Sequence, residues 1–188
     1  LGFMVRGVAE GGEFLGHETV PGPVVYLTEQ SPGTFREVLA RSNLTTCQNV
    51  HVLSWHDVRS DKWPAVVQAA YQKCVQIGSR FLVVDTLPQF AGLRGDAENN
   101  AGDALSAIEP VQAVAGQGIA VLIVRHDRKS GGEVGSSARG SSAFGGAVDI
   151  ILQIGKVDGS SRPTLRALRA LSRFDDTPAE LTIERLDD

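Results

Sequence analysis

Two carboxylates and one histidine stand at the ends of short apolar runs, and these side chains have the clearest chemical potential in the chain. They are Glu29, Asp85 and His126. A short continuous apolar run is typical of a buried strand in a parallel sheet, and ligands bind beyond the carboxyl ends of such strands. If the three strands are neighbours, these side chains converge on one cleft. There, one carboxylate can orient or deprotonate water, the other can hold Mg²⁺, and the histidine can sense a γ-phosphate, as metal-assisted phosphoanhydride hydrolysis requires.

Each of these residues also has an ordinary structural explanation. Asp85 can cap the turn or helix after its strand, and Glu29 can be a solvated residue at a strand end. His126 can be a satisfied histidine at the edge of a sheet. However, a buried carboxylate such as Asp85 needs a charged or metal partner. The coincidence of all three residues at strand ends favours the functional interpretation.

The residues around these positions predict an α/β fold in which strands and helices alternate. Short apolar runs rich in β-branched residues predict strands, whereas apolar residues three and four apart predict helices. Short links between them indicate right-handed βαβ units and therefore a mostly parallel sheet flanked by helices. The predicted strands are 24–28, 50–53, 80–85, 119–124 and 147–154, and the predicted helices are 1–10, a helix starting at 31–34, 63–77 and 100–115.

The remaining segments are two predicted loops and an ambiguous tail. Residues 87–100 and the Gly/Ser-rich stretch 131–146 are predicted to be loops. The tail contains arginines spaced four, three and four residues apart, which would line one face of a helix. It can also form a β-hairpin of strands 165–174 and 181–186, and we favour the hairpin because Asp-Asp-Thr-Pro at 175–178 is a good turn. The four arginines are Arg162, Arg166, Arg169 and Arg173.

The composition is that of one globular domain. A chain of 188 residues is about the size of a single domain, and its net charge of −4 argues against generic coating of nucleic acid. Cys47 and Cys74 have no metal-site spacing, so we interpret them as reduced thiols. No apolar run is long enough to span a membrane, and the N-terminus lacks the pattern of a signal peptide. We therefore expect a single domain over residues 1–188 of a cytoplasmic protein without membrane association.

Five motifs resemble RecA-like ATPase domains of the RepA type, which are related to hexameric replicative helicases. Their order and spacing cover most of the chain, and together they are more specific than any one of them. The motifs are EFLG at 13–16 with PGPVVYLTE at 21–29, VVDTL at 83–87, VRHDRK at 124–129, RGSSAFGGAVD at 139–149 and RFDDTPAEL at 173–181. The resemblance implies a RecA-like sheet, with ATP and Mg²⁺ as cofactors.

The same resemblance implies a role for each candidate residue. Glu29 would activate the attacking water, and Asp85 would hold Mg²⁺ through water with Thr86 beside it at the nucleotide. His126 would be the sensor that links the phosphate state to the following loop. Arg173 matches an arginine finger that reaches the nucleotide of a neighbouring subunit, so the resemblance also implies a homo-oligomeric ring, expected to be a hexamer. The alternative for Arg173 is a solvated arginine on a strand.

Four basic residues in two loops are candidates for nucleic-acid binding. By the resemblance, these loops would face the central channel of a ring and could grip single-stranded DNA through its phosphates. The residues are Arg94, Arg128, Lys129 and Arg139. Their alternative is a set of solvated loop charges. At the level of the whole protein, the expected function is an ATP-hydrolysing motor of a DNA helicase, and the rival is a non-hydrolysing interaction module that retains the fold.

One motif of the family is absent from these 188 residues. Gly-x-x-x-x-Gly-Lys-Ser/Thr, whose backbone amides and lysine bind the phosphates, does not occur. In the family this loop comes directly before the helix that here begins at Leu1. The sequence is therefore expected to start just after the loop, the rival being an ATPase that has lost it. In either case we expect residues 1–188 by themselves to bind ATP weakly or not at all.

Overall fold

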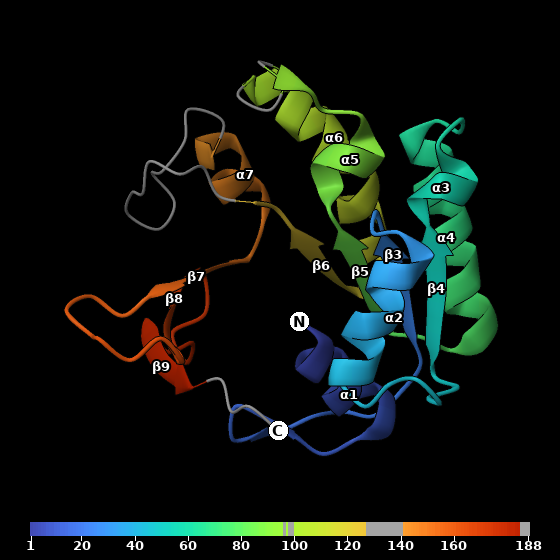
Figure 1. The fold of residues 1–188 in the computed structure, drawn as a ribbon. Helices are drawn as coiled ribbons and strands as arrows, with labels where there is room; N and C mark the ends of the chain where they lie inside the picture. The colour runs from blue at the N-terminus through green and yellow to red at the C-terminus, as the bar shows by residue number, and fades with distance from the viewer. Residues whose placement is uncertain (96, 98–99, 127–140, 185–188) are drawn as a thin grey trace. The chain divides into compact units, whose positions relative to one another are not determined.

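The computed structural model describes residues 1–95, 97, 100–126 and 141–184, and side chains from residue 144 onward in the last segment (Figure 1). Its contacts divide the chain into two compact units. The first consists of Leu1–Glu98 and Ser106–His126, and the second of Asn99–Leu105 and Asp127–Asp188. The single domain expected from the length of the chain stays a prediction.

The first unit is built on a parallel sheet whose strands have the order β4-β3-β5-β6 in the described part of the chain. Its central strands β3 and β5 are almost entirely buried, which explains why they read as continuous apolar runs rather than as alternating ones. The predicted parallel sheet flanked by helices is thereby confirmed. The strands are β3 (Val24–Thr28), β4 (Val50–Ser54), β5 (Phe81–Asp85) and β6 (Ala120–Val124).

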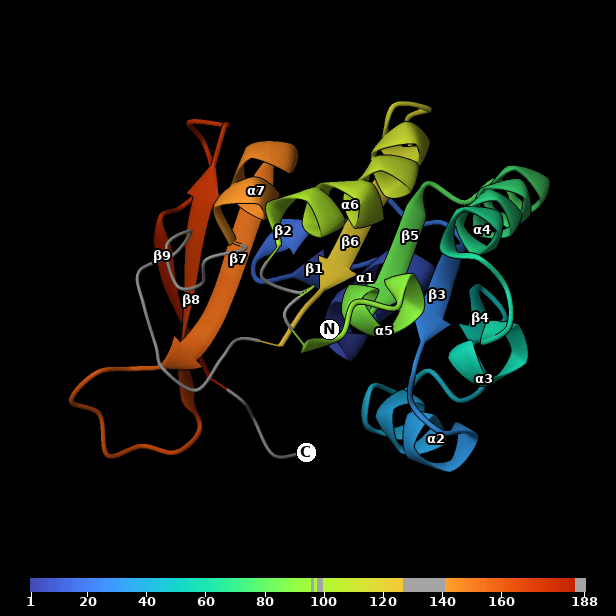
Figure 2. The same ribbon diagram turned by 90° about the horizontal axis from the view of Figure 1, so that it is seen from above.

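Helices cover both faces of this sheet (Figure 2). On one face, α1 (Gly2–Glu10) and α2 (Pro32–Arg41) enclose a core with β3 and β5. On the other face lie α4 (Trp63–Ile77) and α6 (Ala101–Ala115), whose residues from 106 onward belong to this unit. The indole N–H of Trp63 ties these two helices together by donating a 2.8 Å hydrogen bond to the carbonyl oxygen of Ala107. Short elements complete the unit: β1 (Glu13–Phe14), β2 (His17–Glu18), α3 (Trp55–Val58) and α5 (Leu87–Ala91).

Helix α5 corrects the prediction of a continuous loop over residues 87–100. Pro88 lies in the first turn of this helix, where its missing N–H has no cost. Gly92 ends the helix in the left-handed conformation, with φ of 70°. Leu87 and Phe90 are buried, so the packing of two apolar side chains stabilises a helix too short to be recognised from periodicity.

The second unit contains an antiparallel sheet of order β7-β8-β9 within the described residues. The strands are β7 (Ile150–Lys156), β8 (Leu165–Ser172) and β9 (Glu180–Glu184). The hairpin favoured for the tail is confirmed, because β8 pairs with β9 and places Leu168 opposite Leu181. The alternative helix through the arginines is wrong.

Two predictions for this unit need correction. Helix α7 (Ser141–Ala147) occupies the end of the stretch predicted as a loop, and buried Phe144 explains its stability. The strand predicted at 147–154 therefore begins only at Ile150, and it pairs antiparallel with β8 rather than joining a parallel sheet. No helix in the described part of the chain is long and apolar enough to cross a membrane.

Candidate active site

The register of β3 and β5 brings two of the predicted site residues together. Thr28 lies opposite Asp85 in this parallel pair, so Glu29 immediately follows the partner of Asp85. The backbone N–H of Glu29 donates a 2.8 Å hydrogen bond to the carbonyl oxygen of Asp85. Both acidic residues therefore lie at the carboxyl edge of the sheet, where open α/β sheets bind their ligands.

Thr86 fixes the carboxylate of Glu29. Its hydroxyl donates a 2.6 Å hydrogen bond to Glu29 Oε2. Thr86 is buried and occupies the position before α5 where a capping side chain is expected, yet its side chain makes no cap hydrogen bond. The hydroxyl is thus directed to Glu29 rather than to the helix. Such a contact with a buried residue is not expected for a glutamate that is only solvated at a strand end.

Tyr26 holds the carboxylate of Asp85 in the same way. The phenol donates a 2.8 Å hydrogen bond to Asp85 Oδ2, and both residues are buried. Burial raises the pKa of Tyr26, and the negative charge of Asp85 and the hydrogen bond to it raise this pKa further. Tyr26 was missed from the sequence, where it looks like one more apolar residue of a buried strand. Tyr26 lies two residues before Thr28, and alternate residues of a strand point to the same face of the sheet. This spacing could have placed Tyr26 on the same face as Thr28, the partner of Asp85.

Replacing Tyr26 by phenylalanine is expected to lower the free energy of unfolding by about 1.5–3 kcal/mol at pH 8, because a buried carboxylate loses its donor. The raised pKa also predicts a pH effect. The stability that the protonated phenol contributes is complete below the ordinary tyrosine pKa of 10.0 and is lost as the pH rises above it. Urea unfolding should show the wild-type chain losing more stability per pH unit above pH 10 than Tyr26→Phe, up to a limit of about 1.4 kcal/mol per unit. Equal losses in both proteins would contradict this assignment.

Leu1, the residue directly before α1, lies near Asp85. The amino end of a helix carries a partial positive charge and unpaired N–H groups, which favour anions such as phosphate. The beginning of α1 therefore adds positive potential near the two carboxylates.

The other predicted residues of the first unit lie further along the chain. His126 follows β6 by two residues, and Val124 of that strand lies opposite Asp85, so the histidine belongs to the same edge of the sheet. Its side chain is exposed. Arg94 is exposed after α5. Arg128, Lys129 and Arg139 lie outside the described residues.

Arg173 belongs to the second unit, directly after β8. Its side chain is exposed, with Nη2 donating to the carbonyl oxygen of Gly146 at 2.7 Å and Nη1 to Asp149 Oδ1 at 3.4 Å. The guanidinium is thus directed toward the end of α7 and the start of β7 of its own unit. An exposed ion pair of this kind contributes little stability, so the arginine can exchange it for another anion.

The acidic residues of this edge fit magnesium that arrives with a nucleotide. Among the described residues, no group of three or more histidine, cysteine or acidic side chains could hold a metal ion by itself. Magnesium, however, commonly binds through one or two carboxylates, several waters and the phosphates of its substrate. A single buried carboxylate at Asp85, oriented by Tyr26, suits this mode of binding.

A parallel sheet with helices on both faces and carboxylates at its carboxyl edge agrees with the class of RecA-like α/β folds, as the comparisons with known proteins show. A family model described as an AAA domain matches residues 4–132, which is more than half of the chain, and the chain belongs to this family. The structure of a KaiC-like protein from the hyperthermophilic archaeon Pyrococcus horikoshii is similar, with a TM-score of 0.57 and 12% sequence identity. The match covers 98% of this chain and 73% of that one, and at this identity it shows the fold alone. No curated protein matches the chain.

Proposed function

We propose that this protein is the ATP-hydrolysing core of a RecA-like motor, in a cytoplasmic DNA helicase of the RepA type. The observation that carries the proposal is the pair of acidic residues at one sheet edge, each held by its own hydroxyl donor. Thr86 donates to Glu29, and Tyr26 donates to Asp85. Side chains held in this way keep their geometry without reorganisation during a reaction.

Glu29 is the general base of the proposed reaction. The Thr86 hydroxyl holds Oε2 of Glu29, which leaves Oε1 to accept a proton from the attacking water. The backbone hydrogen bond from Glu29 to Asp85 fixes the main chain at the same point. Positioning of water by this carboxylate supplies the orientation on which phosphoryl transfer largely depends.

Asp85 is the proposed magnesium residue, with Thr86 beside it at the nucleotide. Bound magnesium would neutralise charge on the phosphates. Tyr26 occupies Oδ2 of Asp85, so the carboxylate is fixed in rotation and its other oxygen can accept from a metal-bound water. His126, at the end of the neighbouring strand, is the proposed sensor of the γ-phosphate.

Assembly and DNA binding complete the proposal. Arg173 acts as an arginine finger in the nucleotide site of a neighbouring copy, which requires a homo-oligomeric ring, proposed to be a hexamer. Its exposure and its weak exposed ion pair with Asp149 support this assignment. The loop residues that would contact single-stranded DNA are Arg94, Arg128, Lys129 and Arg139.

Isothermal titration with MgATP tests the nucleotide site. Because the phosphate-binding motif is absent from these residues, we expect the chain as given to show no binding tighter than millimolar. Joining a Gly-x-x-x-x-Gly-Lys-Ser/Thr segment before Leu1 should bring the affinity into the micromolar range, and replacing the lysine of that segment by alanine should reverse the gain. Micromolar binding by the chain as given, or no gain on joining the segment, would contradict the proposal.

The alternative function is a non-hydrolysing module that retains the fold and assembles with partners. Such a protein needs no general base, so the hydrogen bonds of Glu29 and Asp85 would serve stability alone. The two functions differ in whether phosphate is released from bound ATP.

A further inference from the structure

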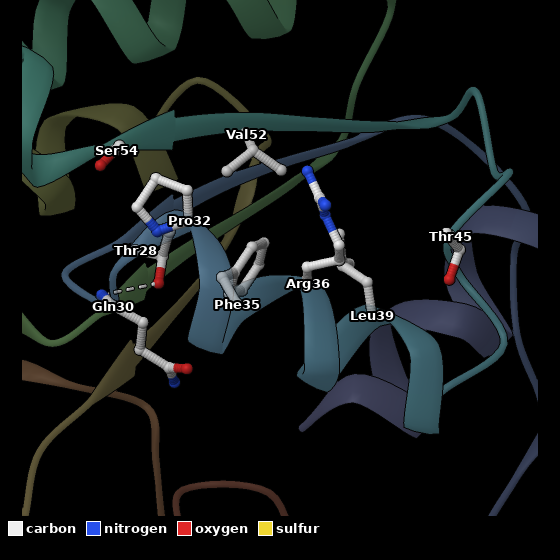
Figure 3. Close-up of a pocket in the computed structure, with 9 residues that line it drawn as sticks. All are labelled: Thr28, Gln30, Pro32, Phe35, Arg36, Leu39, Thr45, Val52 and Ser54. Carbon is white, nitrogen blue, oxygen red and sulfur yellow. Dashed lines mark hydrogen bonds between the residues drawn. The ribbon is translucent and has the colours of Figure 1, made fainter.

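A pocket of about 290 Å³ lies between α2 and β4 in the first unit, and we call it the α2–β4 pocket (Figure 3). Its walls are largely apolar, formed by Pro32, Phe35 and Leu39 around α2 and by Val52 of β4. Val52 is 45% exposed, although it is a large apolar residue of a strand. The pocket is large enough for an aromatic ring, since a cavity of about 150 Å³ is known to bind benzene.

A positively charged side chain lines this pocket and makes no ion pair within the described part of the chain. Arg36 lines the pocket, and its side chain extends from α2 toward β4 alongside Val52 (Figure 3). It is exposed and makes no ion pair with a described residue, whereas the adjacent Glu37 pairs with Arg41 at 3.5 Å. The pocket therefore combines an apolar interior with one available positive charge.

The turn between β8 and β9 in the second unit presents the complementary groups. Phe174 is 53% exposed. The next two residues, Asp175 and Asp176, are exposed and make no ion pair with a described residue. The turn is preformed, because the N–H of Phe174 donates to Ser172 Oγ at 3.0 Å and the hydroxyls of Ser172 and Thr177 lie 2.8 Å apart. A preformed turn offers its aromatic ring at a small entropic cost.

We propose that the α2–β4 pocket of one copy of this chain receives Phe174 from the β8–β9 turn of a second copy. The ring fills the apolar interior, and Asp175 and Asp176 approach Arg36. One surface carries the aromatic ring and two negative charges, whereas the other carries the cavity and one positive charge, so the contact is complementary in shape and charge. Because the two surfaces differ, the contact is head-to-tail and can be repeated around a ring.

This contact would also bring an arginine to the candidate active site, a consequence that rests on the proposed function. Thr28 and Gln30, which flank Glu29 in the sequence, both line the α2–β4 pocket. Arg173 directly precedes Phe174. Docking of the ring therefore places the arginine of one copy near the general base of another. Phe174 is thus a positioning residue for the proposed finger, and its docking itself requires no nucleotide.

Sedimentation velocity tests the contact. It is measured over a range of concentrations of residues 1–188, without a joined phosphate-binding segment and without nucleotide. We expect reversible self-association, weakened by roughly 10- to 100-fold in Phe174→Ala, as for an anchor residue at an interface. Phe3→Ala is the matched control, because Phe3 is exposed to a similar extent, 49%, and lies on α1. Circular dichroism should show unchanged folding in both variants. A monomer at all concentrations, or equal effects of the two variants, would overturn the proposal.

A charge exchange gives a second, independent test. Arg36→Asp alone and Asp175→Arg with Asp176→Arg alone should each weaken association, whereas an equimolar mixture of the two variants should restore it, because both kinds of contact between unlike copies pair opposite charges. Nuclear magnetic resonance should show the methyl groups of Val52 and Leu39 shifting with concentration in the wild-type chain and in Phe3→Ala, and much less in Phe174→Ala. Shifts that are independent of concentration would indicate docking within one chain and would overturn the contact between copies. Because neither test involves ATP, their failure is distinguishable from failure of the proposed ATPase.

Discussion

Replacing Glu29 by glutamine is expected to lower the rate of ATP hydrolysis by about 10²–10⁴-fold in the chain joined to a phosphate-binding segment. The amide keeps the size of the carboxylate and can still accept the hydrogen bond of Thr86, but it cannot take a proton from water. ATP affinity should change little, because Glu29 is proposed to act on the water rather than on the nucleotide. Phosphate release at saturating MgATP measures the effect, and titration calorimetry measures the affinity.

Glu37→Gln is the matched control for this experiment. Glu37 lies on the exposed side of α2, where it makes a 3.5 Å ion pair with Arg41. Loss of an exposed pair of this kind costs little, so the rate of hydrolysis should stay at the wild-type value. If Glu29→Gln also hydrolysed ATP at the wild-type rate, the assignment of Glu29 as the general base would be wrong.

Arg173→Ala is expected to lower hydrolysis by about 10³-fold or more in the same joined chain. A guanidinium beside the transferred phosphoryl group neutralises the charge that develops there, and no other group replaces it after truncation. Folding should be unaffected, since the hydrogen bonds of Arg173 to Gly146 and Asp149 are exposed. Arg162→Ala is the control, because it removes an exposed arginine that pairs with Glu184 of the same sheet.

Mixing two inactive variants tests whether the arginine acts between copies. A mixed assembly of Arg173→Ala and Glu29→Gln contains some sites with an intact Glu29 from one copy and an intact Arg173 from the next. Such sites should recover part of the activity that neither variant shows alone. If mixing restored nothing while both variants assembled with each other, Arg173 would not act in a neighbouring site.

Much of the first unit could be predicted because its core strands are buried on both faces. The runs ending at Thr28 and Asp85 are continuous apolar segments, and the observed strands end at these residues. Helix α4 spans the predicted residues 63–77. Most of the apolar residues whose spacing predicted this helix lie on its buried face. The placement of Glu29 next to Asp85 follows from a general property of parallel sheets, in which carboxyl ends share one edge.

The hydrogen bonds that hold the candidate site could not be predicted in the same way. The contact between Tyr26 and Asp85 depends on which residues lie opposite each other, and periodicity within one strand does not give the register between two. The direction of β7 also could not be predicted. An alternating apolar pattern indicates a strand but does not show with which other strand it pairs. Helices α5 and α7 are stabilised by a few buried side chains rather than by a long apolar stripe.

The central claim is that these residues form the catalytic edge of an ATPase. Its most direct test is phosphate release from ATP by the unmutated chain joined to a phosphate-binding segment, measured with and without magnesium. We predict sustained release that requires magnesium and exceeds that of the chain as given. Tight binding of ATP without any release of phosphate would contradict the claim and would favour the non-hydrolysing module.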